Sequence, residues 1–176
     1  MIFVTVGTHE QQFDRLVRRI DELKGNGMIR EDVMIQTGYS RWQPEHCQWR
    51  QWLSYQEMVK YMDEARIVVT HGGPSSFLMP MKMGKVPVVV PRKKEYGEHV
   101  NDHQVDFVRG LNAENPCLVT VEDIDRLGEV LVHYDRYSAV CQSGPDENNA
   151  RFNRQLMQLV DQLMRPKRRY QVFGVR

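Results

Sequence analysis

Short apolar runs alternate with amphipathic segments along most of the chain, and this pattern predicts the order of its elements. Apolar runs predict strands over residues 2–6, 33–36, 47–53, 66–70, 86–90 and 117–120. Helical spacing predicts helices over 12–24, 55–64, 101–109 and 121–134, with one more between the fourth and fifth strands. The alternation predicts an α/β fold, a Rossmann-like parallel sheet with helices on both faces. Right-handed crossovers favour the strand order 3-2-1-4-5-6.

The chain changes character after residue 142. Ser143-Gly144-Pro145-Asp146 interrupts the pattern, and an amphipathic helix is expected over 147–164, followed by a basic tail over 167–170. We therefore divide the chain into a domain over 1–142 and a C-terminal helix with its tail over 143–176. Two interpretations of this helix stay open, packing on its own domain or docking on a partner. The tail could contact anionic lipid or simply be solvated.

Composition and charge exclude several classes of protein. The chain has 176 residues, 41% hydrophobic and 27% charged, as is usual for a soluble globular domain. Its formal net charge of +1 provides no overall field to attract nucleic acid. The three cysteines are odd in number and form no CxxC pair, which favours a reducing cytosol over a disulfide framework or a zinc site. No apolar run approaches the ~20 residues of a membrane span, and none is typical of a signal peptide.

Three glycine-containing turns each follow a predicted strand, so a parallel sheet would bring them to one edge, where α/β folds bind ligands. These turns are Gly7-Thr8, Thr37-Gly38 and His71-Gly72-Gly73-Pro74-Ser75-Ser76. The third suits an anion because its glycines allow close approach and it leads into a helix N-terminus. Ser75 and Ser76 are also expected to cap that helix. Each turn alone is equally compatible with ordinary turn chemistry.

A polar loop after the fifth strand adds hydrogen-bonding groups at the same edge. The residues of interest there are Glu98, Asn101, His103 and Gln104. They could bind a ribose or a sugar, or be solvated.

Several familiar motifs are missing. The first strand is followed by GTHEQQ rather than GxGxxG, and there is no GxxxxGK[ST], HExxH or EF-hand loop. His71, His99 and His103 lack a recognised ligand spacing, so no metal site and no cofactor is expected. No third group marks Ser75 or Ser76 as an activated nucleophile.

Together these stretches resemble the donor-binding half of GT-B glycosyltransferases of family 28. The resemblance rests on VTVGT near the start, HGGPS at 71–75, GKVPVVVP at 84–91 and GEHVNDHQ at 97–104. It is closest to split bacterial enzymes that build capsular or exopolysaccharide repeat units. Their relative is the catalytic subunit that adds the second N-acetylglucosamine to the dolichol-linked oligosaccharide.

This resemblance implies one half of a GT-B fold, active with a separate membrane-anchored acceptor-domain subunit. It implies diphosphate contacts at Gly7, Thr8 and the 72–76 turn, and donor-sugar or ribose contacts at Glu98, Asn101, His103 and Gln104. One departure is Met79, which stands where single-chain relatives carry an acidic residue for the ribose; that role is expected to move to Glu98.

The expected function is therefore that of an inverting glycosyltransferase subunit. The expected donor is a UDP-sugar, carrying galactose first and N-acetylglucosamine second. The expected acceptor is a lipid-diphosphate-linked sugar at the cytoplasmic face of the plasma membrane, where the chain would be peripheral through its partner. His9 is the local candidate for the catalytic base, although the partner could supply it. Two alternatives stay open: an enzyme of another type, such as a UDP-sugar epimerase, and a non-catalytic nucleotide-binding module.

Overall fold

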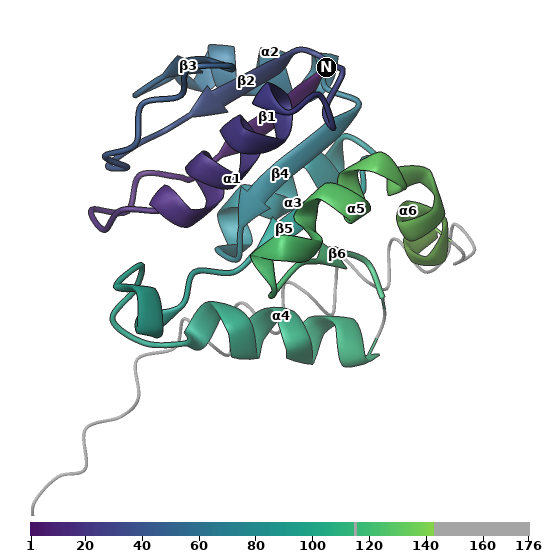
Figure 1. The fold of residues 1–176 in the computed structure, drawn as a ribbon. Helices are drawn as coiled ribbons and strands as arrows, with labels where there is room; N and C mark the ends of the chain where they lie inside the picture. The colour runs from purple at the N-terminus through teal and green to yellow at the C-terminus, as the bar shows by residue number, and fades with distance from the viewer. Residues whose placement is uncertain (115, 143–176) are drawn as a thin grey trace, which may run out of the picture. The chain divides into compact units, whose positions relative to one another are not determined.

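A parallel six-stranded sheet forms the centre of the domain in a computed structural model that describes residues 1–114 and 116–142. The strands are β1 (Ile2–Thr5), β2 (Val33–Gln36), β3 (Gln48–Arg50), β4 (Ile67–His71), β5 (Val88–Val90) and β6 (Val119–Thr120). Their order is β3-β2-β1-β4-β5-β6, and every neighbouring pair is parallel. The α/β fold class and the strand order predicted from the sequence are both confirmed (Figure 1).

Helices cover both faces of this sheet. They are α1 (Asp14–Gly25), α2 (Tyr55–Glu64), α3 (Pro74–Lys82), α4 (His103–Glu114), α5 (Leu127–Val132) and α6 (Tyr134–Gln142). Two short 3-10 turns, η1 (Lys94–Tyr96) and η2 (Ile124–Arg126), complete the described elements. In Figure 1, α1 and α5 lie in front of the sheet and α3 behind it.

Alternating side chains of the strands divide the core into two layers. Ile2 and Val4 face a large cluster that includes the apolar positions of α1 and α5. Phe3 faces the other way, into a smaller cluster with Met62 of α2 and Met79 of α3. Period-two alternation within the strands therefore divides their side chains between the two helical layers.

Some element boundaries differ from those expected. α4 begins at His103 rather than at residue 101, because Oδ1 of Asn101 accepts a hydrogen bond from the His103 amide and holds the chain just before the helix. The single helix expected over 121–134 is instead η2 and α5, and α6 follows after a break at His133. The helix expected over 147–164 lies outside the described residues.

The carboxyl ends of the central strands are level with one another, which sets the position of the loops. Thr5 pairs with Thr70 of β4 and with Gln36 of β2, and His71 pairs with Val90 of β5. The loops that follow these four strands therefore begin at one edge of the sheet. The three glycine-containing turns were predicted to lie at this edge.

Candidate functional site

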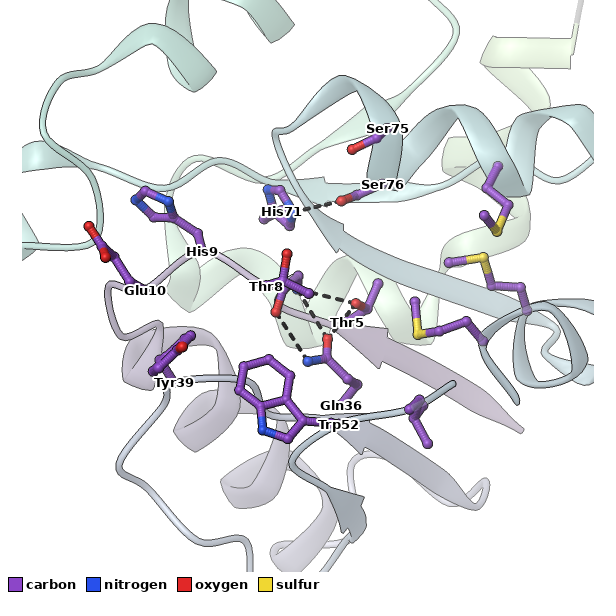
Figure 2. A pocket seen from close by; sticks show the side chains of 15 residues that line it. Thr5, Thr8, His9, Glu10, Gln36, Tyr39, Trp52, His71, Ser75 and Ser76 are labelled. Atoms are coloured by element: carbon purple, nitrogen blue, oxygen red, sulfur yellow. Dashed lines mark hydrogen bonds between the residues drawn. The ribbon is translucent and has the colours of Figure 1, made fainter. Parts of the chain in front are cut away.

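A pocket of about 700 Å³ opens at the carboxyl edge of the sheet. Figure 2 shows that residues from the loops after β1 and β2 approach it from one side, and the start of α3 from another. Its polar lining comprises Thr5, Gly7, Thr8, His9, Glu10, Gln36, His71, Ser75 and Ser76. Its remaining lining is aromatic or apolar: Tyr39, Trp52, Leu53, Met58, Met62 and Met79.

Gln36 fixes the turn that follows β1. Its Oε1 accepts hydrogen bonds from the Gly7 amide at 3.1 Å and from the Thr5 hydroxyl at 2.7 Å, and its Nε2 donates to the Gly7 carbonyl at 3.1 Å. Gly7 has a φ of +76°, a left-handed conformation that other residues rarely adopt. Because the Gly7 amide is already bonded to side chains, this residue lines the pocket without a free N–H for a ligand.

The second predicted turn supports the first instead of lining the pocket. The amides of Thr37 and Gly38 donate to the carbonyls of Arg50 and Gln51. Thr37 is buried, and Gly38 lies against the Gly7 carbonyl. Neither residue belongs to the lining of this pocket, and the contacts of Thr37 and Gly38 with a ligand stay a prediction.

His71 is held in one tautomer by the turn that follows it. Its Nδ1 accepts a hydrogen bond from the Gly73 amide at 3.0 Å, and its Nε2 lies 2.6 Å from Oγ of Ser76. Burial, reinforced by the nearby charge of Arg92, lowers the pKa of His71 to about 4. The ring is therefore neutral at neutral pH, with Nε2–H donating to Ser76. The Ser76 hydroxyl proton is thus left to point at another acceptor.

Two glycine turns enclose this ring. A Cβ atom at Gly73 would lie 2.3 Å from Cε1 of His71, and one at Gly7 would lie 2.5 Å from Nε2. Both positions therefore exclude a side chain because of His71. The glycines found in the sequence serve the packing of this histidine as well as any close approach of a ligand.

The N-terminus of α3 faces the pocket without a side-chain cap. Gly73 is the N-cap residue, and Pro74 occupies the first turn, where its missing N–H costs nothing. The predicted capping by Ser75 and Ser76 is wrong, because both lie inside the first turn. Their side chains line the pocket instead, beside the positive end of the helix dipole.

Glu98 is directed into the protein. Its carboxylate is fully buried and accepts two hydrogen bonds from Arg15, at 2.8 and 2.9 Å, and one from the Lys93 amide. Both carboxylate oxygens thus have donors within the protein, and Glu98 is not part of the lining of this pocket; its ribose contact stays a prediction.

The other three predicted residues of this loop also lie outside the lining of the pocket. Asn101 bonds to the amide of His103, whose side chain is exposed. Gln104 has a bridging position: its Oε1 accepts hydrogen bonds from the amides of Gly72, at 2.9 Å, and Arg92, at 3.1 Å. Gln104 therefore joins the loops after β4 and β5, and Gly72 contributes no free amide either.

His9 lies at the mouth of the pocket, stacked on a second histidine. The ring centroids of His9 and His99 are 4.8 Å apart. Nε2 of His9 lies 2.8 Å from Oε1 of Gln11, so it is the donor and Nδ1 is the basic nitrogen. Burial and the neighbouring His9 lower the pKa of His99. This stacked pair of histidines therefore stands beside the predicted anion site.

The sequence analysis missed the aromatic wall of the pocket. Tyr39 and Trp52 meet edge to face at 5.1 Å between centroids, although the two side chains are 49% and 44% exposed. Each follows a strand of the sheet by two or three residues, and this repeated spacing could have indicated them. Exposed aromatic rings in a pocket provide flat surfaces for a base or a sugar ring.

Within residues 1–114 and 116–142, no cluster of three or more histidine, cysteine or acidic side chains is arranged to bind a metal ion. Nor does any helix in the same range have the length and apolar character needed to cross a bilayer.

Comparisons with known proteins agree with this architecture. Residues 1–161 match the Glycosyltransferase family 28 C-terminal domain. The glycotransferase of kitacinnamycin has the same fold, with a TM-score of 0.53 and 17% identity over 92% of this chain and 42% of that one. SnogD from Streptomyces nogalater has a TM-score of 0.43 and 18% identity, over 92% of this chain and 43% of that one. CalG4, the calicheamicin glycosyltransferase, has a TM-score of 0.44 and 16% identity, over 90% of this chain and 43% of that one. No curated protein sequence matches the chain.

The chain thus spans less than half the length of these structurally similar glycosyltransferases. Its sheet is that of a donor-binding domain of the GT-B type. Since the family match extends over most of the chain, this protein belongs to the glycosyltransferases that carry the family 28 C-terminal domain.

Proposed function

We propose that the pocket binds a nucleotide-sugar donor, namely a UDP-sugar carrying galactose or N-acetylglucosamine. One observation carries this proposal: the uncapped N-terminus of α3 and the aromatic pair Tyr39–Trp52 line the same pocket. A diphosphate suits the first feature, because the positive end of the helix dipole favours anions. The flat ring of a base or a sugar suits the aromatic pair Tyr39–Trp52. A pocket of about 700 Å³ is in the range of known ligand sites.

In this proposal the start of α3 stabilises the leaving diphosphate. The oxygen of Ser76 accepts a hydrogen bond from Nε2–H of His71, so its own hydroxyl hydrogen can donate to a phosphate oxygen. Thr8 and Ser75 line the same space and add hydroxyl groups. Donors positioned before the reaction stabilise developing charge at little cost in reorganisation.

His9 is proposed as the base that accepts the proton of the acceptor hydroxyl. Its Nδ1 carries the lone pair, and its loop borders the pocket. Inversion would follow from attack of that oxygen on the anomeric carbon, opposite the departing diphosphate. The proton of the attacking hydroxyl then resides on the imidazole.

We further propose that an acceptor-domain subunit supplies the other half of the active site. The chain spans only 42–43% of the length of the similar glycosyltransferases. The partner would be membrane-anchored and present a lipid-diphosphate-linked sugar for polysaccharide synthesis at the cytoplasmic face. The C-terminal segment over 143–176 is the proposed docking element, and the chain would be peripheral at the membrane through it.

Calorimetric titration with UDP, with and without EDTA, tests the binding proposal. Metal-independent binding supports it, and failure of the wild-type chain to bind UDP contradicts it. Radiolabelled sugar transfer to a lipid-diphosphate acceptor, with and without the co-expressed partner, tests the activity. Transfer only with the partner supports the two-component enzyme. Epimerisation of the donor would indicate the alternative enzyme. Binding of UDP without turnover would indicate a nucleotide-binding module. Transfer by the isolated chain would show that the enzyme does not need the partner.

A further inference from the structure

Arg92 is the largest fully buried side chain of the described residues, and each hydrogen bond of its guanidinium within them goes to a main-chain carbonyl. One nitrogen donates to the carbonyls of Gln11, Gln12 and Glu98 at 2.9 to 3.0 Å, and the other terminal nitrogen donates to Val6 at 2.8 Å. The guanidinium carbon also lies 4.7 Å from the ring centroid of Phe13. Residues 6 to 13, the loop after β1, therefore close around this single cation.

The main chain of Arg92 extends the connection to a third loop. Its amide donates to Oε1 of Gln104, which also accepts from the Gly72 amide. Arg92 thus joins the loop that carries His9, its own loop that carries His99, and the turn that begins α3. Two of these loops line the pocket, and the third lies against His9 through the stacked ring of His99.

Burial of the Arg92 guanidinium has a desolvation cost, which its hydrogen bonds must offset. Burial lowers the pKa of Arg92 to about 10, with Glu98 acting in the opposite direction, and the side chain is therefore charged at neutral pH. Its Nε has no hydrogen-bond partner among the described residues. An apolar side chain of similar volume would avoid the desolvation cost but could not bond four carbonyls.

We infer that Arg92 is a positioning residue for the donor site: it sets the loop of His9 against the start of α3. The inference rests on the proposed function in that it takes the pocket as the donor site. Lysine cannot replace arginine here, because one ammonium nitrogen cannot reach all the carbonyls that the two terminal guanidinium nitrogens bond.

The chain offers a matched control at the opposite edge of the sheet. Nζ of Lys85 donates to the carbonyls of Asp63 and Ala65, both at 2.7 Å, just before β4 begins. Lys85→Met therefore also removes a cation that binds main-chain carbonyls, and it leaves the carboxyl edge intact. The variants to compare are Arg92→Met, Arg92→Lys and Lys85→Met in the full chain.

Two measurements test the inference, UDP affinity by calorimetry and the imidazole NMR resonances of His9 and His99. In Arg92→Met, UDP affinity is expected to fall at least about tenfold, since displacing a binding group by 1 Å can cost up to ~100-fold. The histidine resonances should also shift as the stacked pair separates. Lys85→Met should lose thermal stability while both readouts stay at their wild-type values.

If Arg92→Met does not fold, Arg92→Lys carries the same test against Lys85→Met. A folded Arg92 variant with wild-type UDP affinity and unchanged histidine resonances overturns the inference, as does an equal loss in Lys85→Met. Should the wild-type chain bind no UDP, the donor proposal fails. The histidine resonances then still decide whether Arg92 positions the loop.

Discussion

Nε2 of His71 and Oγ of Ser76 lie 2.6 Å apart at the start of α3. Since Nδ1 of the same ring accepts from the Gly73 amide, the proton of the neutral imidazole must be on Nε2. The serine oxygen is the acceptor in this pair, which distinguishes it from the activated serine of a hydrolase. The pair therefore prepares a hydroxyl donor, not a nucleophile.

Ser76→Ala should weaken UDP binding by ~1–1.5 kcal/mol, about tenfold in Kd, because one hydroxyl donor to the diphosphate is lost. Calorimetry at neutral pH measures this change. Ser138→Ala is the control, since its hydroxyl bonds to Asp135 on α6, outside the pocket. Equal affinity of Ser76→Ala and the wild type would remove Ser76 from the proposed diphosphate site.

Trp52→Ala should weaken UDP binding by ~1–3 kcal/mol, the scale of one base stacked on an aromatic side chain. The control is Tyr55→Ala, because Tyr55 is 72% exposed but does not line the pocket. Titration of both variants with UDP gives the comparison. If the two variants bind UDP equally well, Trp52 does not hold the base.

Acid should destabilise the protein through His71. A histidine titrates near 6.5 when unfolded, whereas His71 in the fold has a pKa of about 4. Between these values the unfolded chain binds a proton that the folded chain does not. The free energy of unfolding should therefore fall as the pH falls from about 6.5 to 4, by up to ~3 kcal/mol from this residue.

Urea unfolding of the wild type and of His71→Asn at pH 7 and pH 5 measures this contribution. The variant should lose less stability over that interval. His133→Asn serves as the control because that side chain is exposed. Identical pH dependence of His71→Asn and wild type would contradict the assignment.

Glu98→Ala should cost ~3–5 kcal/mol of unfolding free energy, because it leaves the partly buried Arg15 without its carboxylate. Glu95→Ala, an exposed change in the same loop, should cost little. Urea denaturation compares the two variants. A Glu98→Ala variant with wild-type stability but weakened UDP binding would contradict this structural role and support the predicted ribose contact.

The sequence predicted the sheet well because its strands are continuous apolar runs. Val33–Gln36 and Ile67–His71 are buried along their whole length, as expected for central parallel strands. It also located the turn at His71–Ser76, because glycine, proline and serine have strong local preferences there.

Sequence patterns could not predict the partners of the polar side chains. Glu98 is 83 positions from Arg15, and nothing local separates a buried ion pair from a solvated carboxylate. Nor does any local pattern predict the hydrogen bonds between Gln36 and Gly7, which are 29 positions apart. Tyr39 and Trp52 were missed for a different reason: they lie in loops outside the helical and strand periodicity, and only their spacing after the strand ends indicates them.

The bonds between Gln36 and Gly7 have a consequence for the thermodynamics of recognition. This turn is already ordered in the free protein by three hydrogen bonds, two to the Gly7 main chain and one from Thr5 to Gln36. Binding of a ligand in the pocket therefore does not include the entropic cost of ordering this backbone. Differences in affinity among ligands should then report their direct contacts, because this part of the site is preorganised.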